Sequence, residues 1–442
     1  MLRDPPSVYR PHRPKGADGF IGTLFVSVRF DSRFASCYNQ YETIIRGPAC
    51  AFTEKREEFF TMQYRKMGNT GVEVSALGFG CMRMPVLEGQ PDNCIDEARA
   101  IGMLRHAIDS GVNYIDTAYF YHHEASEPLV GKALRDGYRE KVNLATKMPV
   151  FSVEKEEDFD FFLNNQLERL QTDHIDFYLM HALSLDSWKN KVLKFDLLTK
   201  AQKARAEGKI RYLGFSFHDN EAAFLEILNG FDGWDFCQIQ MNYIDVENQA
   251  TLRGLEAAHK KGLGVVIMEP LLGGKLANLS PQVKNTLDGS RTPVEWALDF
   301  LWNRPEVSVV LSGMGSEEMV EQNLEYAARS SVGMLDAAQL EMLANTRSVY
   351  QKMALVPCTG CAYCMPCPFG LDIPGIYEIY NQTVNDSRAM TVEKYASLAK
   401  QADACRACRK CEGICPQHIE SSTLMPVIHE KIAKMKAELE KK

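Results

Sequence analysis

From Val74 onward, short apolar runs alternate with longer segments whose apolar residues recur at helical spacing. The short runs have the length and composition of buried strands. They lie at residues 77–80, 113–116, 142–147, 175–180, 212–215, 236–240, 264–268 and 308–311. Eight strand-helix units over about 260 residues predict an α/β fold, a (β/α)8 TIM barrel, rather than an open sheet.

The segments between these runs have the pattern of amphipathic helices. They include residues 95–109, 156–170, 185–207 and 251–261, and several end at a glycine: Gly111, Gly208 and Gly262. A turn around Asn69, Thr70 and Gly71 precedes the first barrel strand. We expect a hairpin there that closes the bottom of the barrel.

Two runs of cysteines dominate the last fifth of the chain. The first run is Cys358, Cys361, Cys364 and Cys367, followed by Pro368; the second is Cys405, Cys408, Cys411 and Cys415, followed by Pro416. Two such runs predict a small, mainly helical, ferredoxin-like domain that binds two [4Fe-4S] clusters, with the fourth cysteine of each run serving the other cluster.

Crossed ligation assigns Cys415 to the cluster of the first three cysteines and Cys367 to the other cluster. The first run departs from the usual spacing, because two rather than three residues separate Cys364 from Cys367. Crossing therefore stays open there. Zinc is an alternative, although zinc sites usually pair two close cysteines with two distant ones. Disulfides are disfavoured because the sequence indicates a reducing compartment.

Composition and charge limit the remaining possibilities. The chain has 442 residues, 45% of them hydrophobic, which predicts two packed domains. A net charge of -8 argues against nucleic acid or an anionic membrane as the main partner. No apolar run approaches the roughly 20 residues of a membrane-spanning helix. The segment 20–30 resembles a signal sequence only weakly, so we expect a cytoplasmic protein.

These observations divide the chain into four parts. Residues 1–61 lack a sustained period and are expected to be a poorly ordered extension ahead of a natural start at Met62. Residues 62–330 form the barrel and 331–354 a helical linker. Residues 355–442 form the cluster domain, whose lysine-rich end from 425 onward is expected to be a solvated surface helix.

Four polar side chains occur where barrel strands end: Asp116, the nearby Tyr121, Lys147 and His181. Reactive residues of such barrels lie at these ends. Hydride addition to a carbonyl leaves negative charge on oxygen, so the site needs a proton donor, for which Tyr121 is the candidate. We expect Lys147 to lower the pKa of that phenol and Asp116 to hold Lys147 in place. His181 is expected to orient the carbonyl oxygen.

With these four motifs, the region from about residue 64 to 325 resembles the aldo/keto reductases. The resemblance implies NAD(P)H-dependent interconversion of carbonyls and alcohols on small molecules. It further implies that Ser216 and Gln238 bind the nicotinamide carboxamide. The residues implied near the pyrophosphate and adenosine are Gly274, Ser312, Gly313 and Asn323. The alternative for the glycine loops is that they form tight turns only.

The sequence departs from the family pattern in three respects. Phe217 stands where an asparagine follows the carboxamide serine, and Met268 stands where an aromatic ring stacks on nicotinamide. Where NADPH-using members carry a cation for the 2'-phosphate, we find Gly313, Met314 and Met319. NADPH preference is therefore not implied, and NADH or a flavin stays open.

Three hypotheses for the whole protein follow. In the first, the clusters relay electrons between the barrel and an electron-transfer protein partner. In the second, the clusters are structural and the barrel is an ordinary carbonyl reductase. In the third, the protein is a redox-sensing regulator with little catalysis. Segments 149–158 and 183–188 are expected to shape the substrate pocket.

Overall fold

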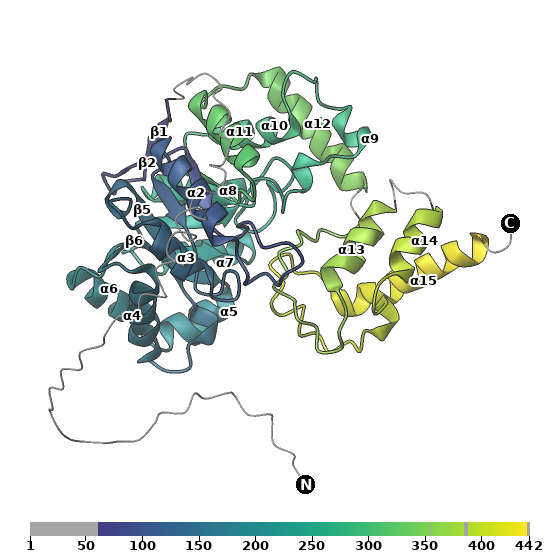
Figure 1. The fold of residues 1–442 in the computed structure, drawn as a ribbon, viewed down its shortest axis with the longest axis horizontal. Coiled ribbons are helices and arrows are strands. Elements are labelled where there is room, and N and C mark those ends of the chain that lie inside the picture. Colours follow the sequence, from purple (N-terminus) through teal and green to yellow (C-terminus); the bar gives the residue numbers. More distant parts are fainter. Residues whose placement is uncertain (1–60, 354, 384–387, 440–442) are drawn as a thin grey trace, which may run out of the picture. The chain divides into compact units, whose positions relative to one another are not determined.

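The computed structural model describes residues 61–353, 355–383 and 388–439. The predicted extension, residues 1–61, lies outside these residues apart from Thr61. The barrel and the cysteine-bearing segment belong to one compact unit. Figure 1 gives the labels of the elements used below.

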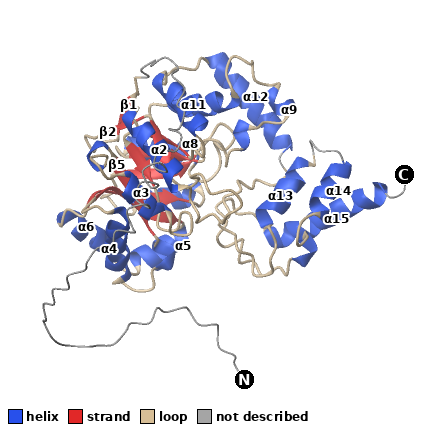
Figure 2. Ribbon diagram, in the orientation of Figure 1, coloured by secondary structure: helices blue, strands red, loops and turns tan. Residues whose placement is uncertain are grey.

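Eight parallel strands close into a barrel in the order β10-β3-β4-β5-β6-β7-β8-β9. They are β3 (Leu77–Gly80), β4 (Tyr114–Asp116), β5 (Asn143–Met148), β6 (Ile175–Leu183), β7 (Ile210–Phe217), β8 (Phe236–Gln240), β9 (Gly264–Met268) and β10 (Val309–Ser312). The predicted barrel is confirmed, and each predicted run corresponds to one of these strands. In Figure 2 the strands (red) are surrounded by helices (blue).

The helices of the barrel follow its strands in sequence. They are α2 (Glu97–Asp109), α3 (Ser126–Ala133), α4 (Asp158–Leu170), α5 (Leu185–Ser187), α6 (Leu197–Ala206), α7 (Glu221–Asn229), α8 (Thr251–Lys260), α9 (Pro281–Lys284), α10 (Pro293–Trp302) and α11 (Glu317–Ala328). The single helix predicted over 185–207 is wrong. Residues Trp188–Leu193 form a π-helix, and Asp196 has φ of 49°, a left-handed conformation that interrupts a right-handed helix.

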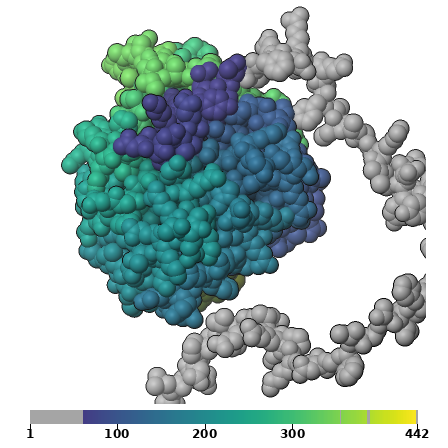
Figure 3. All heavy atoms as spheres, turned by 90° about the vertical axis from the view of Figure 1, so that its left-hand side faces the viewer, coloured from purple at the N-terminus to yellow at the C-terminus, as the bar shows by residue number. Residues whose placement is uncertain are grey.

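A hairpin precedes the barrel, as predicted. Its strands β1 (Tyr64–Lys66) and β2 (Glu73–Ser75) are antiparallel. Met67 is fully buried and packs with side chains of the barrel interior, among them Tyr114 and Phe177. The Tyr212 hydroxyl donates to the Thr70 carbonyl oxygen at 3.1 Å. The hairpin, dark purple in Figure 3, therefore covers the end of the barrel opposite the strands' C-termini, and the reactive end is the other one.

Beyond the barrel, α12 (Ala337–Met353) leads to three further helices. These are α13 (Ile373–Gln382), α14 (Arg388–Ala396) and α15 (Ser421–Leu439). They share a small core of their own, against which six of the eight cysteines of the two runs pack. The expectation of a solvated C-terminal helix is only partly right. One face of α15 is exposed, but Met425, Ile428 and Ile432 are buried in that core.

Candidate active site and cluster-binding domain

The structure brings the four predicted catalytic side chains together. Asp116, Lys147 and His181 lie on β4, β5 and β6, and Tyr121 follows β4. Lys147 Nζ donates to Asp116 Oδ1 at 2.7 Å and Oδ2 at 2.8 Å. It also lies 3.4 Å from Tyr121 Oη. The Lys147 and Asp116 side chains are 1% and 3% exposed, so the ion pair is shielded from water.

His181 completes the group on the other side of the phenol. The ring centroids of Tyr121 and His181 are 6.3 Å apart, in an edge-to-face arrangement. His181 Nδ1 is buried and has no hydrogen-bond partner among the described residues. An imidazole and a phenol therefore face one small space in which a polar atom of a ligand can be hydrogen-bonded.

Burial controls the protonation of this group. The pKa of Asp116 is raised by burial, against the opposing effect of Lys147. Burial and then Lys147 hold the pKa of His181 well below its usual value, so the ring is neutral. The pKa of Tyr121 is raised well above its usual value, chiefly by burial and then by Asp116.

The pKa of Tyr121 is raised, although Lys147 was expected to bring it below its usual value; burial and the Asp116 carboxylate outweigh the ammonium. The reason is geometric: the ammonium lies closer to the Asp116 carboxylate and to the Thr117 carbonyl oxygen, at 2.7 Å, than to the phenol. Its charge is thus balanced by a neighbour that itself repels a phenolate. In this arrangement the phenol keeps its proton.

The two residues expected to bind a carboxamide are neighbours across β7 and β8, where Ser216 pairs with Gln238. Ser216 Oγ accepts from the Ala182 N–H at 2.7 Å and keeps its own proton to donate. Gln238 Oε1 is buried and has no partner among the described residues. An unpaired acceptor beside a free donor fits a primary amide.

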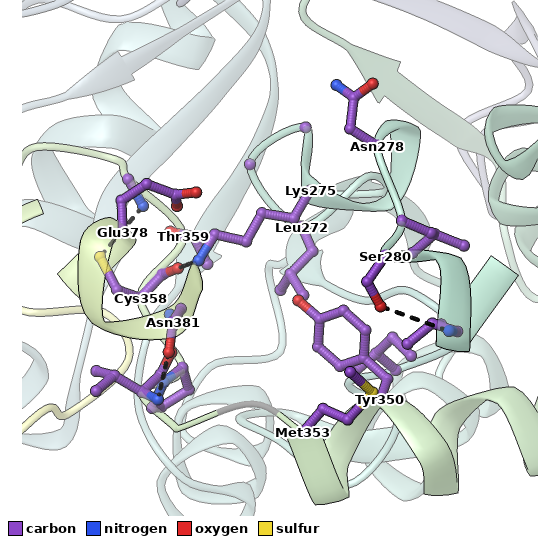
Figure 4. Close-up of a pocket in the computed structure, with 18 of the residues that line it drawn as sticks. Leu272, Lys275, Asn278, Ser280, Tyr350, Met353, Cys358, Thr359, Glu378 and Asn381 are labelled. Carbon is purple, nitrogen blue, oxygen red and sulfur yellow. Dashed lines mark hydrogen bonds between the residues drawn. The ribbon is translucent and has the colours of Figure 1, made fainter. Parts of the chain in front are cut away.

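The residues expected near the phosphates and adenosine fall into two groups. Asn323 Nδ2 donates to Ser312 Oγ at 2.9 Å, and both side chains are buried. Gly313 follows Ser312, and a Cβ there would lie 3.4 Å from the side chain of Arg83. Gly274 has φ of 91° and lines a cavity of about 700 Å³ that Arg83 and Lys275 also line (Figure 4).

Sequence reasoning missed Arg83 and Glu269. Arg83 follows β3 but lies against Gly313, where the local sequence offers no cation. It makes no ion pair or hydrogen bond within the described part of the chain, although its charge lowers the pKa of the buried Glu269, so its guanidinium can still donate to a phosphate. Glu269 follows β9; burial raises its pKa, and its Oε2 has no partner among the described residues. Only closure of the barrel reveals either position.

The first three cysteines share a pocket with Cys415. This pocket is lined by Cys358, Cys361, Cys364 and Cys415, and also by Cys411 of the second run. Burial, and then the charges of the other three thiols, raise the pKa of Cys364 to about 12. Thiols around one space suit a cluster, but the pocket also contains Cys411, which crossed ligation gives to the other cluster, so the crossed assignment stays a prediction. Among the described residues, no three Cys, His, Asp or Glu side chains surround a single ion position.

The second set is less enclosed. Cys405 contributes to the raised pKa of Cys411, after burial, so these two thiols are neighbours. Cys408 is exposed, and Cys367 packs against the small core of the domain. We find no contact that places Cys367 with the other three. The assignment of Cys367 to the cluster of Cys405, Cys408 and Cys411 therefore remains a prediction.

Hydrogen bonds join the first cysteine set to the rim of the barrel. Gln249 Nε2 donates to the Pro416 carbonyl oxygen at 2.9 Å, and Gln417 Nε2 donates to Gln240 Oε1 at 2.8 Å. Both bonds involve the two residues that follow Cys415. Lys275 donates to the Cys358 carbonyl oxygen. The barrel thus holds the backbone at two of the four cysteines.

Comparisons with known proteins agree with this geometry. Residues 76–289 match the aldo/keto reductase family model. The match falls within the barrel, which is therefore similar to the aldo/keto reductases. Residues 357–420 match the 4Fe-4S dicluster domain. The chain therefore combines a barrel similar to the aldo/keto reductases, which supports an oxidoreductase, with a region that matches an iron-sulfur domain.

Individual relatives cover the barrel. L-galactose dehydrogenase from Arabidopsis thaliana is 28% identical over 62% of this chain and 91% of its own length. The aldo-keto reductase AKR11C1 from Bacillus halodurans, in its holo form, is 25% identical with a TM-score of 0.55, over 64% of this chain and 96% of that one. The thermostable aldo-keto reductase Tm1743 is 26% identical with a TM-score of 0.53, over 64% of this chain and 100% of that one.

The described residues contain no helix that combines the length and apolar character needed to cross a membrane.

Proposed function

We propose that this protein interconverts a carbonyl and an alcohol, with Tyr121 as the proton donor to the carbonyl oxygen. The observation that carries the proposal is the partly buried Tyr121 beside the buried pair of Lys147 and Asp116, with a neutral His181 on the far side of the phenol. A nicotinamide bound beside Ser216 and Gln238 would supply or accept the hydride.

Each side chain has a definite task in this scheme. A phenol whose pKa is raised keeps its proton at neutral pH and can donate it as the carbonyl oxygen gains charge. Lys147 then favours the phenolate that forms. Neutral His181 fixes the carbonyl oxygen through a ring N–H. Asp116 positions Lys147 and does not touch the substrate.

Aromatic side chains bound the open side of this site. Phe151 lies 5.8 Å from His181 and 5.4 Å from Phe120, measured between ring centroids, and both phenylalanines are exposed. Phe151 falls within segment 149–158, which was expected to shape the pocket. We infer a substrate with an apolar or ring-shaped body beside its carbonyl. Because one relative is named L-galactose dehydrogenase, sugar lactols and aldoses join aromatic aldehydes in the assay panel.

Replacing Tyr121 with Phe tests the catalytic assignment. General-acid catalysis is typically worth about 10²- to 10⁴-fold, so we expect a loss of that size in kcat. Tyr138→Phe is the matched control, because this phenol bonds to Asp109 at the surface. The assay measures the rate at which each compound of the panel is reduced, with NADPH and with NADH. A Tyr121→Phe enzyme as active as Tyr138→Phe would refute the assignment.

We propose that the cysteines hold two [4Fe-4S] clusters, which supply one-electron transfer to or from a protein partner. Eight thiolates suit a reducing compartment, for which we propose the cytoplasm. The alternative of purely structural clusters has its own support, because six of the cysteines pack against the small core of their domain. Absorption spectra recorded anaerobically distinguish the two roles. Bleaching of the oxidised clusters by NADH or NADPH with substrate supports electron relay. Cluster absorbance that stays unchanged during turnover supports the structural role.

A further inference from the structure

Three of the chain segments that line the cavity beside the barrel rim carry the inference. One wall is the loop after β9, with Leu272, Gly274 and Lys275. The second is the end of α12, with Tyr350. The third begins the cysteine-bearing segment, with Cys358 (Figure 4). A ligand in this cavity therefore contacts both the coenzyme loop of the barrel and the backbone of a cluster ligand.

Loop and cysteine run are in direct contact. A Cβ on Gly273 would lie 1.9 Å from the carbonyl oxygen of Thr359, and Gly273 has φ of 66°, so no side chain fits there. Two residues later, the Lys275 ammonium donates to the Cys358 carbonyl oxygen. Figure 4 shows the lysine side chain reaching across the cavity to that carbonyl. The Lys275 ammonium can thus donate either to phosphates in the cavity or to the carbonyl oxygen of Cys358.

We propose that Lys275 couples dinucleotide binding to the cluster held by Cys358, because coenzyme phosphates in the cavity draw its ammonium away from the Cys358 carbonyl. The inference rests on the proposed function, which places a dinucleotide at this rim. Arg83 and Lys275 supply positive charge for a pyrophosphate, while Asp245 and Glu378 line the same cavity and oppose it. Lys275 acts here as a positioning residue, since it contacts the coenzyme and the cluster's peptide but no reacting atom.

The sign of the coupling follows from charge. Reduction adds an electron to the cluster, and a nearby donor or cation stabilises that added charge. Moving the ammonium toward phosphates weakens this stabilisation, and the phosphates add negative charge. The reduction potential of this cluster should therefore fall when a dinucleotide binds. By linkage, the dinucleotide binds less tightly to the reduced protein.

The experiment uses the anaerobic, cluster-loaded full chain and ADP-ribose, with and without a 2'-phosphate, because these probes carry no hydride. Calorimetry measures their binding, and redox titration followed by electron paramagnetic resonance measures both cluster potentials. We expect about threefold weaker binding to the reduced protein, which is roughly 28 mV at 59 mV per tenfold change for one electron. The second cluster is an internal reference, because its cysteines make no hydrogen bond to the barrel within the described residues.

Lys275→Gln should lower the potential of the first cluster before any nucleotide is added and should leave a smaller shift on binding. Lys284→Gln is the matched control, because Lys284 lies on the neighbouring α9 but does not line the cavity. The inference is overturned if Lys275→Gln and Lys284→Gln give the same ligand-free potential, or if wild type binds a probe with no shift. Failure of both probes to bind wild type would instead count against the coenzyme site itself.

Discussion

Replacing Asp116 with Asn should destabilise the barrel far more than an exposed substitution would. Among the described residues, the carboxylate is the only counter-charge that bonds to Lys147 Nζ; the other partners are the Thr117 carbonyl oxygen and the Tyr121 hydroxyl. Both charged side chains are almost fully buried. Asn keeps one acceptor oxygen but leaves the ammonium uncompensated in a place that water does not reach.

The expected loss of folding free energy comes from removing the charge that compensates the Lys147 ammonium. Removing one partner of a buried pair typically costs about 3–5 kcal/mol, which is a large part of the roughly 5–15 kcal/mol that stabilises a domain. Lys147→Met should cost less, because a buried carboxyl left without its cation can take up a proton. In the double variant no buried charge remains. It should be more stable than Asp116→Asn alone, with a coupling energy of roughly 3 kcal/mol.

Urea unfolding of the cluster-loaded protein measures these differences through tryptophan fluorescence. All four tryptophans, Trp188, Trp234, Trp296 and Trp302, are buried in the barrel, so the signal reports on this domain. The reasoning fails if Asp116→Asn costs less than about 1 kcal/mol, or if the double variant is no more stable than that single variant. None of the three variants should keep wild-type activity, since each removes part of the proposed site.

The pH dependence gives an independent check. The folded-state pKa of Asp116 is raised by burial, and Lys147 opposes that rise. A carboxyl with a raised pKa binds a proton on folding, so stability falls as pH rises from its ordinary pKa through its folded pKa. Lys147→Met removes the opposing effect and widens this interval. Its stability deficit should be smaller at about pH 5.5 than at about pH 8.

Three further outcomes follow from the structure. Cys415→Ser should alter the same electron paramagnetic resonance signal as Cys358→Ser, and iron should fall from about eight to about four per chain; signals from different clusters would refute crossed ligation. Carbonyl reduction should not decline between about pH 7 and about pH 9 through Tyr121, because burial raises the pKa of that phenol; a decline that Tyr121→Phe abolishes would contradict this. Gln249→Leu leaves the buried Pro416 carbonyl without its donor, which should lower the free energy of opening of the cluster domain by about 1–3 kcal/mol. Proteolysis of that domain should therefore be faster. An unchanged rate would show that this bond does not hold the domain.

Much of the fold could be predicted from the sequence because the local strand and helix patterns agree with the barrel that they form. Each barrel strand is a short apolar run buried on both sides, and such runs differ plainly from the helical periods between them. Glycines at positive φ, such as Gly111 and Gly208, end helices where the pattern predicted. The failure at 185–207 has a local cause, since nothing in the apolar pattern signals a left-handed Asp196.

The amino-acid sequence by itself determined the barrel, the cysteine spacing and the four polar strand ends, because each is written in a periodicity or a spacing along the chain. The tertiary structure alone decided the electrostatics. In the folded protein, burial raises the pKa of Tyr121, whereas the residue types around it had suggested a lowered pKa. It also brought Arg83 to Gly313 and Lys275 to Cys358, contacts between residues far apart in the chain. Desolvation and long-range proximity depend on closure of the whole fold, and no local pattern encodes them.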